Sequence, residues 1–150
     1  MLSSLRATAL SSQEQSKSGG YFEPSHIHSQ PFGETLGKWT AESSRGKTER
    51  LSFIKDQLSL TDTLLKHIRY QPFHRTASAV IEAGRFNASN AAMIVHTFNQ
   101  NDLWFDDYQN FLALFGIQAS EPGKLFFLKE THGVKLYSGW AHGDDKFLRV

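Results

Sequence analysis

The stretch AAMIVHTF at residues 91–98 is short, apolar and rich in β-branched side chains. Polar segments bound it on both sides, NASN at residues 87–90 and NQND at residues 99–102. A run of this length and composition is typical of a strand that is covered on both faces in the middle of an α/β sheet. We therefore predict a central strand over residues 91–98.

The segments that follow this run predict a helix and then a hairpin. Asp102 is expected to cap a helix over residues 103–115, and Gly116 is expected to end it. One stripe of this helix is aromatic and contains Trp104, Tyr108, Phe111 and Phe115. Further on, KLFFLKE and VKLYSGWAH flank the turn THG, in which Gly133 can adopt a positive φ. This pattern predicts a hairpin over residues 124–142.

The segments before the central run predict helices. Apolar residues at Leu51, Ile54 and Leu58 have the spacing of an amphipathic helix over residues 45–58. Proline is preorganised at the first position of a helix, so Gln71 is expected to cap a helix over residues 72–83 that Gly84 ends. The alternative is one kinked helix over residues 62–83, and the sequence does not separate the two.

Together these elements predict one α/β (α+β) domain over residues 31–144. We expect a small mixed sheet, made of the central strand and the hairpin, packed against three or so helices. Residues 1–30 hold eight serines and no sustained periodicity, so they are predicted to be an irregular tail, as are residues 145–150. One hypothesis for the abrupt change near residue 30 is a shifted reading frame or a late start codon.

Composition narrows the possible functions. The chain has no cysteine, which excludes disulfides, zinc–thiolate sites and thiol nucleophiles and fits a reducing compartment. No apolar run is long enough to cross a bilayer, and residues 1–15 have no apolar h-region. We therefore expect no secretory signal and a cytoplasmic protein without a membrane partner. The formal net charge of +1 leaves nucleic-acid binding to a local basic patch.

Two groups of residues are candidates for binding or catalysis. Gln71, Arg75, Ser78 and Glu82 share one helix face beside His74, and such a face could grip phosphate or position a nucleophilic water. Basic residues surround Trp39 in the first third of the domain and could contact a nucleic-acid backbone; among them are Lys38, Lys47 and Arg50. The alternative for both groups is a solvated, charged surface.

The sequence contains few residues whose spacing suits metal binding. His26 and His28 alternate as two ligands on one strand face would, but no third ligand lies near them in the sequence, so a loop with two histidines is the alternative. His96 lies near the end of the central strand, where α/β proteins often place site residues; the alternative, which we favour, is a histidine hydrogen-bonded inside the sheet. Asp102, Asp106 and Asp107 gather at a helix start, where the helix dipole stabilises negative charge without a metal.

Several segments resemble a bacterial family of domains of unknown function over residues 31–144. They are PFGETLGKW, GKTERLSFIKDQL, RYQPFHRTASAVIEAGRFN, MIVHTF, WFDDYQNFLALFG and LYSGWAHGD, and the RYQxxHRTASA segment is the most specific. That family resembles the PD-(D/E)XK, or restriction-endonuclease-like, superfamily. Its members place a strand ending in Glu-x-Lys just before the Pro-Phe-Gly stretch, and the resemblance assigns Gln71, His74 and Arg75 to the helix that borders the active site.

The resemblance implies a truncated nuclease core without its metal site. Mg²⁺ chemistry needs acidic residues and a lysine, whereas SHIHSQ at residues 25–30 offers neither. We therefore expect a catalytically inactive domain without a cofactor that retains nucleic-acid binding through Lys38, Lys47, Arg50 and Arg75. The alternatives are a non-catalytic protein-interaction module and, third, an active Mg²⁺-dependent nuclease with His26 and His28 as unusual ligands. Missing strand neighbours also predict self-association through an exposed sheet edge.

Overall fold

The computed structural model describes residues 6–11, 32–42, 44–61, 65–98, 102–119, 121–144 and 146. Within these ranges the elements are, in chain order, β1 (Arg6–Ser11), α1 (Leu36–Ala41), α2 (Arg45–Gln57), the short 3-10 helix η2 (Leu65–His67), α3 (Tyr70–Arg85), β2 (Asn90–Thr97), α4 (Phe105–Ala113), β3 (Leu125–Thr131) and β4 (Val134–His142). The predicted α/β class, with a mixed sheet and a helical layer, is confirmed. None of the helices in these ranges is both long and apolar enough to span a membrane.

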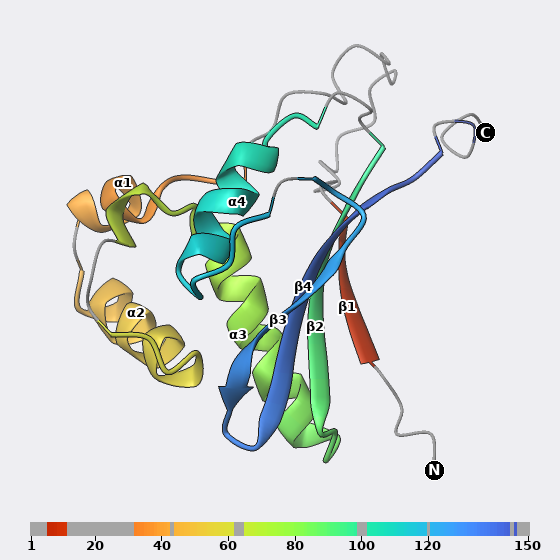
Figure 1. Ribbon diagram of the computed structural model, residues 1–150. Coiled ribbons are helices and arrows are strands. Elements are labelled where there is room, and N and C mark those ends of the chain that lie inside the picture. Colours follow the sequence, from red (N-terminus) through yellow and green to blue (C-terminus); the bar gives the residue numbers. More distant parts are fainter. Residues whose placement is uncertain are drawn as a thin grey trace, which may run out of the picture.

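The sheet has the strand order β1-β2-β4-β3. β2 pairs in parallel with β1 on one edge and with β4 on the other, and β3 pairs antiparallel with β4. Figure 1 shows the four α-helices on one side of this sheet, with α3 running along it. The strands and the helices therefore form two layers.

Among the described residues the helices lie on one face of β2, whereas the sequence predicted a strand covered on both faces. Met93 and Val95 are buried on the face that α3 packs against, whereas Ile94 and His96 on the opposite face are partly exposed. The pattern is ambiguous at the sequence level because short alanine and β-branched runs suit either environment.

The strand pairing corrects two further predictions. The tail predicted over residues 1–30 contains β1, so the prediction of irregular structure is wrong for residues 6–11. Because β1 and β4 pair with both edges of β2, the open edge on which we based self-association does not exist at that strand. The edge strand β3 carries a register shift between Phe127 and Lys129, and Lys129 donates a hydrogen bond to the Ser59 carbonyl, two features that disfavour further strand pairing.

α3 begins two residues before the predicted start. Its N-cap is Arg69, which makes no side-chain capping bond, so the expected cap at Gln71 is wrong. Pro72 lies within the first turn, where a backbone N–H has no partner inside the helix and a proline costs no hydrogen bond. The kink that the alternative prediction placed at Pro72 is therefore not required.

α3 ends at Arg85, past the predicted stop at Gly84. Asn87 adopts the left-handed conformation, with φ of 50°. The Ala88 N–H donates to the Ala83 carbonyl at 2.8 Å, and the Asn87 N–H donates to the Gly84 carbonyl. These two bonds form a Schellman motif, in which asparagine can replace glycine.

Two turn predictions are confirmed and one capping prediction is wrong. His132 and Gly133 both have positive φ and form the two-residue turn of the β3–β4 hairpin, and Gly116, with φ of 73°, follows α4. Asp102, however, does not cap α4. The N-cap is Trp104, in the left-handed region with φ of 72°.

One core lies between the helical layer and the sheet. It is formed by side chains from α1, α2, α3, α4, β2, β3 and β4, and its largest fully buried members are Tyr108, Phe73, Phe111, Leu36, Leu58, Met93, Leu112 and Leu136. Tyr108, Phe105 and Trp140 contact one another through their rings, which joins α4 to β4. This core fixes α3 and α4 against the sheet.

Because the hydroxyl of Tyr108 is buried, the free energy of unfolding is expected to change with pH in the alkaline range. The hydroxyl oxygen of Tyr108 is 3.1 Å from Ser138 Oγ. Burial raises the pKa of Tyr108 to about 12, against the opposing effect of the Ser138 hydrogen bond. An unfolded tyrosine ionises near about pH 10, so the unfolded state loses this proton first and the free energy of unfolding is expected to fall as the pH rises from about 10 to about 12.

Denaturant titrations across this pH range measure the effect. The Tyr108→Phe variant has no proton to lose at this position and should show a shallower decline than the wild type. Equal slopes for the two proteins would contradict the assignment.

Candidate nucleic-acid interface

The segment before α1 is tied to the segment before α3. Thr35 and Arg69 form an isolated antiparallel bridge. The Leu36 N–H donates to the Ile68 carbonyl at 2.7 Å, and the Tyr70 N–H donates to the Glu34 carbonyl at 2.9 Å. This pairing places the N-termini of α1 and α3 side by side and fixes which of their side chains meet.

Three rings stack across this junction. The rings of Trp39 from α1 and Tyr70 from α3 lie 4.6 Å apart at 16°, and the rings of Tyr70 and His74 lie 5.4 Å apart at 19°. Tyr70 and His74 are one helical turn apart, so their side chains point the same way. We call Trp39, Tyr70 and His74 the aromatic stack; each is only partly buried.

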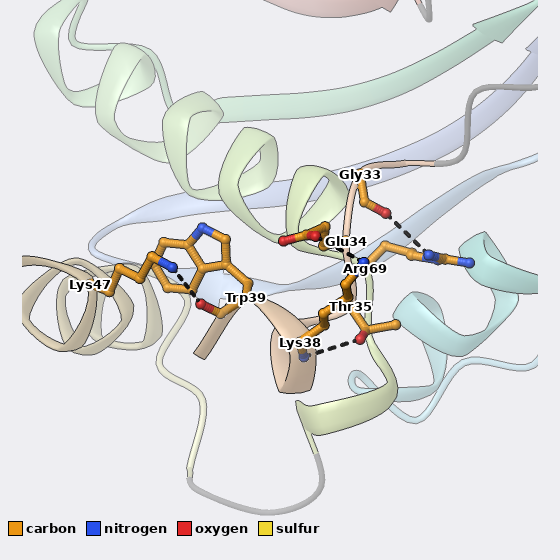
Figure 2. A network of polar contacts seen from close by, with 7 residues as sticks. All are labelled: Gly33, Glu34, Thr35, Lys38, Trp39, Lys47 and Arg69. Atoms are coloured by element: carbon orange, nitrogen blue, oxygen red, sulfur yellow. Dashed lines mark hydrogen bonds and ion pairs between the residues drawn. The ribbon is translucent and has the colours of Figure 1, made fainter. Parts of the chain in front are cut away.

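Basic side chains from α2 and α3 surround this stack. Lys47 Nζ donates to the Trp39 carbonyl at 2.9 Å, as Figure 2 shows, and lies 5.4 Å from the centre of the Trp39 ring. Arg50 and Arg75 are exposed, and both are close enough for their charges to act on His74. We call Lys47, Arg50 and Arg75 the basic cluster.

The surroundings of His74 favour its neutral form. Burial lowers the pKa of His74 below its usual value, and the positive charges of Arg75 and then Arg50 lower it further. The unfolded chain therefore binds a proton at this position more readily than the folded protein, and this group opposes folding as the pH falls below about 6.5. Two fixed cations beside a neutral imidazole make a site suited to an anion.

The structure brings together some of the predicted site residues and separates others. Lys47, Arg50, His74 and Arg75 meet at the stack. Gln71 instead packs against Gly33, where an added Cβ would lie 3.3 Å from Gln71 Cγ.

The remaining predicted residues have other surroundings. Lys38 forms an exposed ion pair with Glu34 at 3.2 Å and has no contact with the stack among the described interactions. On the polar face of α3, the Ser78 hydroxyl donates to the His74 carbonyl and Glu82 pairs with Arg85. The metal candidates His26 and His28 lie outside the described residues.

Two polar pairs near this site were not predicted. Arg69 Nε donates to Asp107 Oδ2 at 2.9 Å, and its Nη1 donates to the Gly33 carbonyl at 3.1 Å; Figure 2 shows the second of these bonds. His142 Nε2 lies 2.5 Å from Asp102 Oδ1. The second pair lies at the carboxyl ends of two parallel strands, because His142 is the last residue of β4 and Asp102 follows β2.

Metal-ligating side chains do not gather in the part of the chain that the structure describes. Within it, no group of three or more His, Cys, Asp or Glu side chains is placed to hold an ion. The three aspartates near the start of α4 separate: Asp102 pairs with His142, Asp107 pairs with Arg69, and Asp106 is exposed.

Comparison with known proteins finds one family. The sequence model described as "Domain of unknown function (DUF6946)" matches residues 28–145. Neither the curated proteins nor the solved structures contain a match.

Proposed function

The chain belongs to the DUF6946 family, and from that premise we propose that the domain binds nucleic acid through the basic cluster and the aromatic stack without cleaving it. The family description names no activity, so the argument starts from the site. The resemblance to PD-(D/E)XK nucleases supports this proposal, because it assigns Gln71, His74 and Arg75 to a helix that borders the active site.

The observation that carries the proposal is the convergence of three cations on stacked rings. Lys47, Arg50 and Arg75 come from two helices, and no carboxylate pairs with any of them among the described interactions. By contrast, neighbouring Lys38 and Arg45 are paired with glutamates. Cations that have no carboxylate partner and lie beside aromatic rings are typical of proteins that bind along a nucleic-acid backbone.

Binding without cleavage follows from the chemistry of the available side chains. Hydrolysis in the PD-(D/E)XK superfamily needs carboxylates to hold Mg²⁺ and a lysine to orient water. Within the described ranges no group of three or more His, Cys, Asp or Glu side chains is placed to hold an ion, and SHIHSQ at residues 25–30 offers imidazoles and hydroxyls. The basic cluster can attract a phosphate, and the described part of the chain brings no set of acidic groups together that would hold a divalent cation.

A protein-interaction module is the second candidate. Leu125 and Phe127 of β3 are 56% and 51% exposed, and Phe127 contacts Tyr137 on the sheet face away from the helices. Exposed apolar side chains grouped on one face favour contact with another protein. This function needs no nucleic acid, so one experiment separates the two.

That experiment measures the affinity for a rhodamine-labelled single-stranded oligonucleotide by fluorescence anisotropy over a series of salt concentrations. The triple variant Lys47→Gln/Arg50→Gln/Arg75→Gln is expected to bind about 100-fold more weakly at low salt, and to lose about 2 from the slope of log affinity against log salt. The lost slope reflects the three phosphate contacts that the variant cannot make.

The matched control is Arg85→Gln/Lys124→Gln/Lys135→Gln, which removes the same charge from exposed positions away from the stack. It should bind as the wild type does. Equal weakening in both triple variants would show that net charge alone drives binding, and no binding by the wild type at any salt concentration would favour the interaction module. Nicking of plasmid DNA on addition of Mg²⁺ or Mn²⁺ would contradict the absence of cleavage.

A further inference from the structure

His74 is the one member of the site whose charge can change near neutral pH. Its ring ends the aromatic stack, and the charges of Arg75 on the same helix and of Arg50 on α2 act on it. Among the described interactions neither ring nitrogen has a hydrogen-bond partner; only the backbone carbonyl of His74 is engaged, by Ser78. The ring nitrogens are therefore available to a ligand.

We propose that His74 takes up a proton when a nucleic-acid phosphate binds at the basic cluster, so that affinity rises as the pH falls. This inference rests on the proposed function and specifies how the same site is regulated. His74 then serves as a switchable hydrogen-bond donor beside the permanent cations Arg50 and Arg75.

The charged groups that face the ring favour such a switch. From α3 itself the neighbouring charge is Arg75, and from α2 it is Arg50. α1 contributes Trp39, which is uncharged and stacks on the far side of the shared neighbour Tyr70, while Lys47 of α2 lies over Trp39. The three causes that shift the pKa of His74 are burial, Arg75 and Arg50, and each of them disfavours the imidazolium.

A bound phosphate favours the protonated form of the His74 ring over the neutral form. Its negative charge offsets the two guanidinium groups, and its oxygens can accept a hydrogen bond from a protonated ring nitrogen. The pKa of His74 is therefore higher in the complex than in the free protein. By linkage, affinity increases as the pH falls between these two pKa values, by up to about tenfold for each pH unit because one proton is taken up.

The test measures oligonucleotide affinity by anisotropy between about pH 8 and pH 5.5, with a rhodamine label whose emission does not titrate in this range. The wild type should bind more tightly as the pH falls. The His74→Gln variant should lose this slope, because glutamine cannot take up the proton. His67→Gln is the matched control, since His67 is exposed on η2 and not part of the site, and it should keep the wild-type slope.

A direct readout follows the His74 ring by NMR in the free and the oligonucleotide-bound protein. Its pKa should rise on binding, and an unchanged or lower pKa would overturn the inference. So would a pH slope that survives in His74→Gln. If the triple variant of the basic cluster loses binding but the wild type shows no pH slope, the inference fails while the proposed function stands. If the wild type does not bind at any pH, both fail.

Discussion

Replacing Phe73 by alanine is expected to lower the free energy of unfolding by about 3–5 kcal/mol, because the change leaves a cavity in a close-packed core. Phe73 is fully buried in α3 and lies one residue before His74. α3 packs against β2 and β4, and its N-terminal half carries Tyr70, His74 and Arg75 of the candidate site. Urea denaturation of the wild type and the variant measures the difference.

Phe53→Ala is the matched control for this prediction. Phe53 lies on α2 with 53% of its surface exposed, so the same atoms are removed with little loss of burial. Its unfolding midpoint should lie close to that of the wild type. Comparable destabilisation by the two substitutions would contradict the packing of α3 against the sheet.

Removing Arg69 is expected to destabilise the fold by about 2–4 kcal/mol, because its partner Asp107 is left unpaired in a partly buried position. The two side chains are 22% and 16% exposed, and Arg69 also lies 5.7 Å from the centre of the Trp104 ring. One guanidinium therefore links the Gly33 segment, the start of α3 and the start of α4. Arg69→Ala should therefore weaken the packing of all three segments.

A double-mutant cycle separates the ion pair from the packing of the arginine stem. Arg69→Ala, Asp107→Ala and the double variant should give a coupling energy of about 1–3 kcal/mol in urea denaturation. The exposed pair formed by Arg45 and Glu49 provides the control cycle, in which solvent screening should leave little coupling. A coupling near zero for the Arg69–Asp107 pair would contradict the proposed link.

The sequence predicted the types of residue in the candidate site, but it identified only some of the individual residues. The sequence indicated Lys47, Arg50, His74 and Arg75, since basic residues near a tryptophan and a polar helix face are visible without a structure. Lys38 was included on the same grounds, yet its neighbour Glu34 pairs with it. Tyr70, which completes the stack, was not singled out, because its role depends on Trp39 being brought beside it from another helix.

Several helix boundaries were missed because more than one residue can satisfy the same local requirement. Gly84 was expected to end α3, but Asn87 adopts the left-handed conformation in its place. Asp102 was expected to cap α4, but its carboxylate pairs with His142. In each case a partner or a packed position elsewhere decided between chemically similar options.

By itself the sequence determined the elements whose signals are local: the strand near residues 91–98, the α2 helix, the hairpin with its glycine turn and the positive φ of Gly116 in the turn after α4. These depend on periodicity and on the φ preferences of single residues, which neighbours in the chain encode. The tertiary structure alone decided that β1 pairs with β2, that the helices cover one face of the sheet, and that Arg69 meets Asp107. Those contacts join residues far apart in the chain, and they form only where burial and strand register bring the backbones together.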